Sequence, residues 1–402
     1  MRERSQKYIL FTSSNFPEGG PGANYLNLFC RGLKSNDTDV SVYLLKGHAF
    51  GNSRYRGPRH GVSLDGIPFT YLGFRQRPDN VALKIMDQSV SLLRLLRILL
   101  SLVFNRKGVT ILLYNSDLFF NLPVHLTAKL ARIRIVKFAA EIIDRSQYRK
   151  SLGGRISRAA YMANFRYLNK MSDKLIVFSY YLKNEFIQMD FEAEKILVQP
   201  NLTDFAFWQP SDIEIKFTVG YSGAPYMKDG LNDLLRALRI LADKKQDVSL
   251  VIIGDATFGR TLIPGLKEEC VKLGIADRVT FTGLVSNKEV KKYLSQCALL
   301  AITRPDTIQT RAGFPTKLGE YFALKKPVLA TRFGDMERYF TDGIDIIFAE
   351  CGDPASIAER IEWTINNSEE LTSIIQSGHE TARQLLEFNV SMKRVLEFLA
   401  PE

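Results

Sequence analysis

The sequence predicts an α/β protein built from two doubly wound domains, and three observations support this. Apolar runs of strand length alternate with longer helical patterns along the chain, as in parallel α/β layers. The length of 402 residues suits two domains of about 200 residues each. Residues 200–211 include Pro200, Trp208 and Pro210, have loop composition and precede a strand-like run, so we expect them to connect the domains.

The expected elements follow from these runs. In the first half the strands are expected at residues 8–13, 40–45, 110–114, 134–139 and 174–178. In the second half they are expected at residues 217–221, 248–253, 279–281, 299–302, 327–330 and 345–348. Helices are expected to begin near Gly22, Leu118 and Tyr180, and to span 231–242, 262–273, 287–294 and 317–324. Residues 46–80 are expected to form a long loop with a hairpin, and residues 385–399 an amphipathic helix.

The positive charge is concentrated in the first half of the chain. Residues 1–200 carry 30 Lys and Arg against 15 Asp and Glu, a net charge of +15, whereas the remainder carries 24 against 28. A basic domain suits nucleic acid, an anionic membrane or an acidic substrate. No helix-turn-helix, zinc-finger or RNA-binding signature is present, so no nucleic-acid partner is expected.

Residues 89–104 form an apolar run that contains Arg94 and Arg97 and is followed by Arg106 and Lys107. The run is shorter than the ~20 residues of a spanning helix. An apolar helix edged with arginine is typical of the interfacial type that lies on an anionic membrane. The alternative is a core helix whose arginines extend to its rim. We favour the membrane interpretation, because the basic excess is confined to this half.

The cysteines and histidines suggest a reducing compartment and no metal. Cys30, Cys270, Cys297 and Cys351 are isolated, and the four histidines are dispersed, so neither a disulfide framework nor a zinc site is expected. The N-terminal residues lack the apolar segment of a secretory signal. The expected location is cytoplasmic, with a possible peripheral position on the inner face of the membrane.

The segment 311–320 predicts an anion site at the start of a helix. Gly313 permits close backbone approach, Pro315 suits a first helical turn, and the free N–H groups of a helix start favour an anion. Lys317 adds a positive charge, and Glu320 can accept hydrogen bonds from two sugar hydroxyls. These residues fit a nucleotide diphosphate and its ribose. The alternative is an ordinary capped helix of an α/β domain.

Other candidate residues follow the carboxyl ends of expected strands, where open α/β sheets bind ligands. Lys228 follows the strand at 217–221, and Arg304 follows the strand at 299–302. In the first half, Gly19 and Gly20 belong to a Gly/Pro-rich turn whose spacing differs from the dinucleotide fingerprint. Cations without a carboxylate cluster suggest that a diphosphate is stabilised without a bound metal, and no cofactor is expected. For Lys228 alone, a solvated surface lysine is the simpler interpretation.

Several sequence motifs are present along the chain. They are Ile196-Leu-Val-Gln-Pro-Asn-Leu-Thr-Asp204 with Phe207 and Pro210, Ser222-Gly223 to Lys228-Asp-Gly230, Val251-Ile-Ile-Gly254, Arg278-Val-Thr-Phe-Thr-Gly283, Gly313-Phe-Pro-Thr-Lys-Leu-Gly-Glu-Tyr321, Gly19-Gly20 and Glu141-Ile-Ile-Asp144. Together these motifs resemble those of GT-B-fold glycosyltransferases of the large retaining family 4 (glycosyl transferases group 1). The resemblance covers almost the whole chain and is strongest at residues 196–350.

Two positions depart from the pattern of this family. The earlier glutamate of its paired-glutamate motif is replaced by Ala312, and the arginine that precedes the phosphate-binding lysine is replaced by Ala224 or Pro225. We interpret both as traits of a subfamily that has the Gly-Phe-Pro-Thr-Lys form of the motif. They leave open how the sugar ring is held.

The resemblance implies two Rossmann-like domains that face each other across a cleft: an acceptor-side domain at 1–203, a donor domain at 204–378, and a C-terminal helix at 379–402 that packs back on the first domain. It implies a metal-independent, retaining transferase that moves a sugar from a nucleotide sugar to a hydroxyl of a glycan or lipid-linked acceptor, as in bacterial surface polysaccharide synthesis. The catalytic candidates are Lys228, Glu141 and Asp144, and the donor-binding candidates are Gly19, Gly20, Arg304, Gly313, Phe314, Thr316, Lys317, Leu318 and Glu320. The resemblance also implies that the loop of Gly19 and Gly20, with the neighbourhood of Glu141 and Asp144, presents the acceptor.

Two other functions stay open at this point. A GT-B-fold sugar-nucleotide 2-epimerase also binds a nucleotide sugar, but it needs acid and base side chains that this chain offers sparsely. A non-catalytic partner subunit would keep the fold without turnover. Ala312 favours the partner subunit, whereas Lys228 and Glu320 argue against it.

Overall fold

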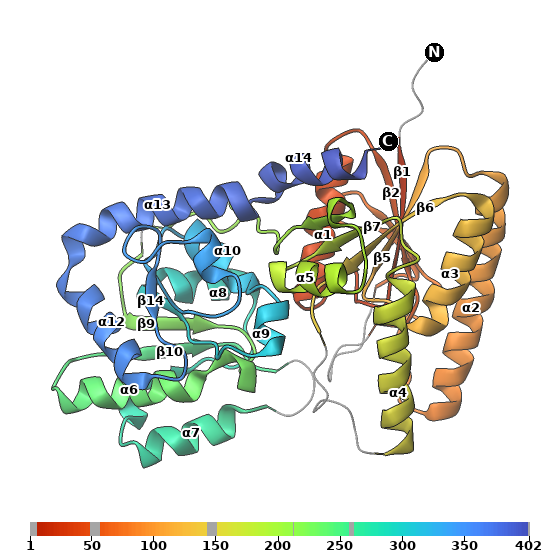
Figure 1. Cartoon of the computed structure of the whole chain (residues 1–402). Coiled ribbons are helices and arrows are strands. Elements are labelled where there is room, and N and C mark those ends of the chain that lie inside the picture. Colours follow the sequence, from red (N-terminus) through yellow and green to blue (C-terminus); the bar gives the residue numbers. More distant parts are fainter. Residues whose placement is uncertain (1–5, 49–56, 143–150, 212, 257–260, 401–402) are drawn as a thin grey trace. The chain divides into compact units, whose positions relative to one another are not determined.

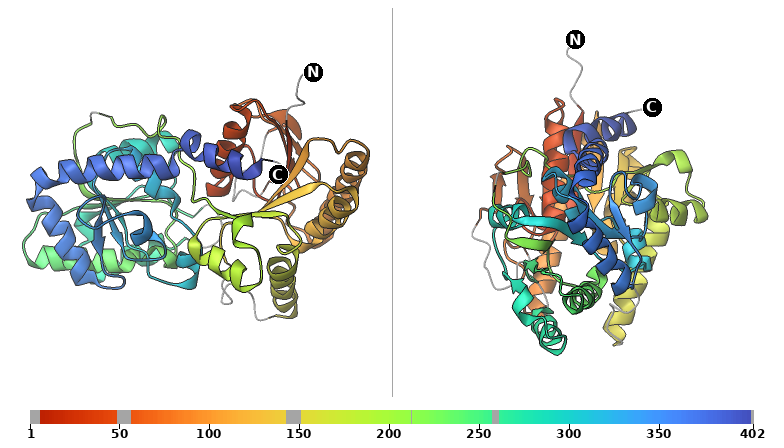
Figure 2. Two further views of the ribbon diagram at one scale, coloured as in Figure 1. Left: turned by 45° about the horizontal axis from the view of Figure 1, so that its top comes forward. Right: turned by 90° about the vertical axis from the view of Figure 1, so that its left-hand side faces the viewer.

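The computed structural model describes residues 6–48, 57–142, 151–211, 213–256 and 261–400. The chain divides into two compact units (Figures 1 and 2). The first unit comprises Met1–Pro200 with Ser391–Glu402, and the second comprises Asn201–Val390. The domain boundaries expected after residues 203 and 378 remain predictions.

The first unit is built on an eight-stranded sheet with the order β3-β4-β2-β1-β5-β6-β7-β8. Its neighbouring strands are parallel, except that β3 pairs antiparallel with β4. The strands are β1 Lys7–Thr12, β2 Asp39–Leu44, β3 His60–Val62, β4 Pro68–Tyr71, β5 Val109–Tyr114, β6 Arg134–Ala139, β7 Lys174–Val177 and β8 Ile196–Val198.

Helices cover both faces of this sheet (Figure 1). Ile111 and Leu113 of β5 share a core cluster with α2 and α3, whereas Tyr114 stacks on Tyr25 of α1, at 5.6 Å between ring centroids. Successive strand residues therefore pack against helices on opposite faces, as a doubly wound sheet requires. The helices are α1 Pro21–Lys34, α2 Val81–Phe104, α3 Leu118–Ala131, α4 Leu152–Ala163, the π-helix η2 Asn164–Leu168, α5 Tyr180–Gln188 and the 3₁₀ turn η3 Ala193–Lys195.

The second unit has a six-stranded parallel sheet with the order β11-β10-β9-β12-β13-β14. Its strands are β9 Phe217–Ser222, β10 Leu250–Ile253, β11 Val279–Phe281, β12 Cys297–Ile302, β13 Val328–Thr331 and β14 Ile347–Ala349. Numbered within the unit, the order is 3-2-1-4-5-6, so the chain reverses its direction of strand addition between β9 and β12. Open sheets bind ligands at such a switch point, beyond the carboxyl ends of the strands.

Two apolar clusters pack on the two faces of the second sheet. The helices that supply them are amphipathic, and α6 has its buried leucines at Leu231, Leu234, Leu235, Leu238 and Leu241, which is helical spacing. The helices and 3₁₀ turns are η4 Met227–Asp229, α6 Leu231–Asp243, α7 Ile263–Lys272, η5 Ala276–Arg278, α8 Asn287–Ser295, α9 Ile308–Ala312, α10 Thr316–Ala323, α11 Met336–Tyr339, α12 Pro354–Asn366 and α13 Ser368–Leu386. The last helix, α14 Phe388–Leu399, belongs to the first unit from Ser391 onward.

The predicted fold class is confirmed, and each predicted strand is present within two residues of its expected limits. The hairpin expected within residues 46–80 is the β3–β4 pair, while residues 49–56 lie outside the described part of the chain. The helix expected at 385–399 is present as α14, Phe388–Leu399, but it begins three residues later than predicted, because Leu385 and Leu386 end α13. The chain is extended at Glu387, because Thr203 hydrogen-bonds on both sides of it: its N–H donates to Leu386 and its carbonyl accepts from Phe388.

Helix α2 contributes to the core with one face only. Asn80 caps its start by accepting hydrogen bonds from the N–H groups of Ala82 and Leu83. Leu95, Leu99 and Leu102 are buried, which agrees with the core-helix alternative for that face, whereas nine large apolar side chains of the same helix are exposed. Among the described residues, no helix is both long enough and apolar enough to cross a membrane.

A buried polar network lies between β6 and the π-helix of the first unit. Lys137 is 5 % exposed, and its ammonium donates to Asn164 Oδ1 at 2.9 Å. Asn121 Nδ2 donates to the same oxygen at 2.7 Å, and Asn121 Oδ1 accepts from Ser116. No carboxylate pairs with Lys137 within the hydrogen bonds and ion pairs of the described residues, and burial lowers its pKa to about 7.

We predict that Lys137→Met changes how stability depends on pH. The unfolded chain keeps this lysine protonated up to about pH 10.5, whereas the folded chain releases the proton near pH 7. The penalty for burying the charge is therefore fully present below about pH 7 and disappears as the pH rises towards 10.5, changing by at most ~1.4 kcal/mol per pH unit. Urea unfolding from pH 6 to 10 should show the variant's relative advantage shrinking as the pH rises. The exposed Lys129→Met is the control, and parallel curves for all proteins would contradict the prediction.

Candidate functional site

Four charged side chains gather at the switch point of the second sheet. Lys228 and Asp229 lie in η4, just after β9, and Arg304 lies just after β12. Lys317 comes from the first turn of α10. The topology explains the meeting, because the carboxyl ends of β9 and β12 are neighbours in the sheet.

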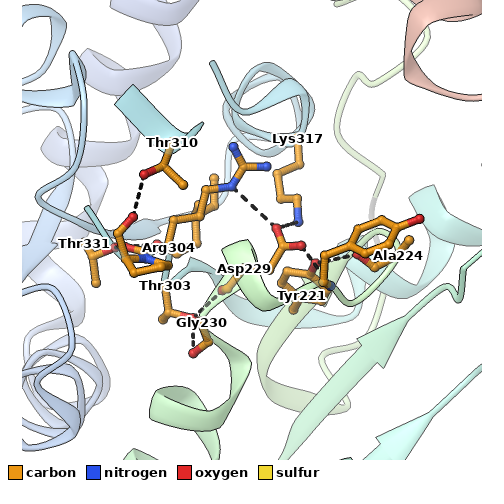
Figure 3. A network of polar contacts seen from close by, with 12 residues as sticks. Tyr221, Ala224, Asp229, Gly230, Thr303, Arg304, Thr310, Lys317 and Thr331 are labelled. Carbon is orange, nitrogen blue, oxygen red and sulfur yellow. Dashed lines mark hydrogen bonds and ion pairs between the residues drawn. The ribbon is translucent and has the colours of Figure 1, made fainter. Parts of the chain in front are cut away.

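Asp229 is the centre of this group (Figure 3). Its Oδ1 lies 3.3 Å from Lys317 Nζ and 3.4 Å from Arg304 Nε. All three residues are buried, at 3 %, 7 % and 8 % exposure. Burial acts to raise the pKa of Asp229, but Lys317, Arg304 and Lys228 together hold it below its ordinary value. The carboxylate is therefore ionised and links two elements that are distant in sequence.

The loop around Asp229 is fixed by its own hydrogen bonds. Asp229 Oδ2 accepts from the Tyr226 N–H at 3.2 Å, and the Asp229 N–H donates back to the Tyr226 carbonyl at 2.9 Å. Thr303 Oγ1 donates to the carbonyls of Asp229 and Gly230 at 3.2 Å. Gly230 has φ +65°, and a Cβ there would lie 1.7 Å from the Thr303 carbonyl oxygen, so this turn requires glycine.

Lys317 lies over the face of Tyr221, with its ammonium 3.7 Å from the ring centroid. This cation–π contact adds to the ion pair with Asp229. A Cβ on Gly223 would lie 3.3 Å from Lys317 Nζ, so the ammonium is next to the loop that contains Ala224 and Pro225. Burial lowers the pKa of Lys317 to about 8, although Asp229 acts to raise it. The α10 lysine thus puts a positive charge beside that loop.

Contacts to both the backbone and the side chain position Arg304. Its carbonyl accepts from Thr331 Oγ1 at 2.6 Å, and its guanidinium lies 5.9 Å from the centroid of the Phe333 ring. Within the described residues, its buried Nε has the Asp229 ion pair and no hydrogen bond. The guanidinium therefore keeps capacity to donate to a further acceptor.

Lys228 and Glu320 are only partly buried. Lys228 is close enough to Asp229 to lower the pKa of that carboxyl. Burial raises the pKa of Glu320 to about 7, while Lys317 acts to lower it. The site carries three cationic side chains, those of Lys228, Arg304 and Lys317, against the carboxylate of Asp229. Glu320 is only about half ionised at neutral pH. The resulting excess of positive charge suits a bound anion.

The other predicted residues of this segment differ in how available they are to a ligand. Thr316 begins α10, as expected of a helix-start site. The Leu318 N–H is not available as an anion donor, because it donates to the Pro315 carbonyl at 3.2 Å, and its side chain is fully buried. Phe314 is buried beside Tyr339 at 5.9 Å between ring centroids. Gly313 has φ −100°, a conformation open to any residue, so its backbone does not require glycine.

In the first unit, the predicted residues lie at the carboxyl edge of the sheet. Gly19 and Gly20 follow β1, and Gly20 is the N-cap of α1. Glu141 follows β6 and is exposed. Burial raises the pKa of Tyr114 at the end of β5, and the charge of Glu141 adds to this effect. Asp144 lies outside the described residues. These strands are neighbours in the order β1-β5-β6, so one sheet edge carries the predicted loop and Glu141.

Sequence reasoning missed Asp229, Tyr221 and Thr303. The signal for Asp229 is its position between Lys228 and a glycine in a strand-to-helix turn, where a buried carboxylate needs cations around it. Tyr221 and Thr303 lie at the ends of predicted strands and look like ordinary core residues. Across the described ranges, with their gaps, no group of three or more His, Cys, Asp or Glu side chains could hold a metal ion.

Comparisons with known proteins agree with this geometry. Residues 205–381, most of the second unit, match the family model described as Glycosyl transferases group 1. The chain is 24% identical over 220 residues to an uncharacterized glycosyltransferase, MJ1178, of Methanocaldococcus jannaschii. That alignment covers 55% of this chain and 57% of the relative, so it spans little more than half of either protein.

Solved structures resemble the chain over nearly its full length. HepE of Anabaena in complex with UDP is 18% identical with a TM-score of 0.71, over 98% of this chain and 99% of that one. The lipopolysaccharide outer core galactosyltransferase WaaB is 14% identical with a TM-score of 0.65, over 98% and 99%. The fold is that of GT-B glycosyltransferases, and the second unit carries the glycosyltransferase family match.

We predict that Asp229→Asn destabilises the protein by about 3–5 kcal/mol, because it leaves Lys317 and Arg304 buried without a counter-charge. Urea unfolding at pH 7.5 measures this. The matched control is Asp243→Asn, which removes the exposed partner of Arg239 and should cost less than about 1 kcal/mol. Equal losses in the two variants would show that the Asp229 cluster does not hold the site together.

Proposed function

We propose that this protein is a retaining, metal-independent glycosyltransferase of family 4. It would move a sugar from a nucleotide-sugar donor to a hydroxyl of a glycan or lipid-linked acceptor, in bacterial surface polysaccharide synthesis. The observation that carries the proposal is the excess of positive charge at the β9/β12 switch point, inside the segment that matches the glycosyltransferase model. A leaving nucleoside diphosphate is the anion that such an edge suits.

Each charged residue has a role in the proposed donor site. The Lys228 ammonium, partly exposed, would contact the departing diphosphate. Arg304 would add a donor from its guanidinium. Lys317 would supply the positive charge that an arginine at Ala224 or Pro225 would otherwise provide. The start of α10 at Thr316, preceded by Gly313 and Phe314, would approach the phosphates, and Glu320 would accept from the ribose hydroxyls.

Uridine nucleotides are the first donors to test. The structures of HepE with UDP and with UDP-glucose resemble this chain over 98% of its length. The three cationic side chains at the site supply positive charge near the phosphates, and we therefore propose that a metal ion is not needed there. Electrostatic stabilisation of this kind contributes roughly 2.7–4 kcal/mol per donor group at an oxyanion.

The acceptor is assigned to the first unit. Gly19, Gly20 and Glu141 lie at the carboxyl edge of its sheet, and Asp144 would extend this group. The named activity of WaaB, transfer of galactose to the lipopolysaccharide outer core, supports a polysaccharide acceptor. The free cysteines Cys30, Cys270 and Cys297 suit the cytoplasm, where nucleotide sugars are available.

We predict that UDP-glucose binds the wild type and that Lys228→Ala and Glu320→Ala each weaken binding about tenfold or more. The reason is that each variant loses hydrogen bonds between a charged group and the ligand, worth about 1.5–3 kcal/mol. Isothermal titration calorimetry measures the affinity, beside GDP- and ADP-linked sugars. Lys288→Ala and Glu268→Ala, exposed residues of the same unit, serve as charge-matched controls. If all variants bind like the wild type, the donor site lies elsewhere.

Catalysis is tested by the product. Incubation with the bound nucleotide sugar and glycan acceptors, followed by NMR of the anomeric proton, would report both transfer and retained configuration, and chelator should leave the rate unchanged. Tight nucleotide binding without transfer to any acceptor would favour the non-catalytic partner subunit. Inversion of the anomeric centre, or dependence on a divalent ion, would contradict those parts of the proposal.

We predict that the affinity for UDP falls as the pH rises above about 8, because Lys317 then loses its proton. At pH 9 only about a tenth of a group with this pKa is charged, so the apparent affinity should fall by up to about tenfold. Calorimetry from pH 7 to 9 measures this. Lys317→Arg keeps its charge throughout and should not show this fall. A wild-type profile that also lacks the fall would remove Lys317 from the phosphate site.

A further inference from the structure

Helices α2 and α3 of the first unit present an apolar face to solvent. They lie side by side on one face of the sheet (Figures 1 and 2) and share the core cluster that contains Leu95, Leu99, Phe120 and Val124. On the side away from that cluster, thirteen large apolar residues are exposed: Val81, Leu83, Ile85, Met86, Leu93, Leu96, Leu100, Val103, Phe104, Phe119, Leu122, Leu126 and Leu130.

The spacing of these residues makes two continuous stripes. Leu93, Leu96 and Leu100 recur at three and four residues along α2, and Leu122, Leu126 and Leu130 recur at four along α3. A helix that is apolar on all sides is normally buried on all sides. Both helices are apolar outside as well as inside, so their outer face needs a partner other than water.

The charges around the face are positive. Arg97, Lys107, Lys129 and Arg132 are exposed, as is Arg106, which follows α2. Asp87 and Asp117 are the acidic residues in the range 81–132. Asp87 is 3 % exposed and accepts from the Phe74 N–H, and Asp117 is paired with Lys46. The face therefore has cations around it and no unpaired carboxylate among its own residues.

The cations and the most exposed apolar side chains meet at one end. Arg106 Nη1 donates to the Ala131 carbonyl at 2.9 Å, so the C-terminal ends of α2 and α3 are adjacent. Phe104 and Leu130 are 79% and 85% exposed at these ends. Lys107, Lys129 and Arg132 are close by in sequence. On a surface of anionic headgroups, this arrangement would let the apolar side chains lie below the headgroups while the cations lie among them.

We propose that the outer face of α2 and α3 is a docking surface for an anionic phospholipid bilayer. The apolar stripes enter the boundary between headgroups and acyl chains, and the surrounding cations pair with lipid phosphates. A second copy of this chain is the other candidate for an apolar face. It is disfavoured because a symmetric contact would bring the same cations together without carboxylates to pair with them. This inference is independent of the proposed glycosyl transfer.

Flotation of the full-length protein with vesicles tests the proposal. Binding is expected to vesicles of phosphatidylglycerol with phosphatidylcholine, to be weak on phosphatidylcholine alone, and to decrease with salt. Phe104→Gln with Leu130→Gln, and separately Lys107→Gln with Lys129→Gln, should each lower the partition coefficient about tenfold or more. The matched control is Val271→Gln with Leu284→Gln, which removes two similarly exposed apolar side chains of the second unit.

Each outcome decides the matter, provided that circular dichroism shows the variants to be folded. Loss of binding in the two α2/α3 variants but not in the control supports the docking surface. Equal binding by all proteins, or no binding to the anionic vesicles, overturns it. Light scattering during gel filtration measures the oligomeric state. If the wild type is a dimer that does not bind vesicles, and Phe104→Gln with Leu130→Gln makes it a monomer, the face binds a second copy of the chain.

Discussion

The ion cluster around Asp229 is the interaction on which the geometry of the second unit's site depends. One carboxylate, 3 % exposed, joins the loop after β9 to the arginine after β12 and to the lysine of α10. Removing Asp229 would leave Arg304 and Lys317 buried without their shared counter-charge, which costs more than the ion pairs contribute when complete. The arrangement therefore positions Arg304 and Lys317 firmly at the switch point while leaving a net positive charge there.

The same cluster also shows which parts of the site can be predicted from sequence. The alternation of strands and helices placed Lys228 and Arg304 at strand ends, and parallel strand ends share one edge, so their meeting could be expected. The partner of Lys317 could not be. Asp229 is 88 residues away in sequence, and a carboxylate beside a lysine in a turn usually lies in solvent. Thr303 Oγ1 also donates to the carbonyls of Asp229 and Gly230, a contact for which the sequence has no local signal.

The fold was more predictable than its details, for a physical reason. Strands buried on both sides must be continuously apolar, and such runs stand out between helical patterns. Short edge strands such as β3 and β8 have three residues each, which is too few for a run that stands out from its surroundings. The break between α13 and α14 has a different cause, because residues 385–399 are amphipathic throughout. The helix is interrupted by backbone hydrogen bonds from Thr203, which periodicity does not report.

Helix α2 illustrates the limit of arguing from composition alone. Its sequence suits both a core helix and an interfacial helix. The structure shows that one face lies in the core with Leu95 and Leu99, while Leu96 and Leu100, one position further along, are exposed. A rotation of about 100° per residue is enough to put neighbouring leucines in different environments. Burial in the core therefore accounts for three large apolar residues of this helix, and the nine exposed ones must be explained by something outside the fold.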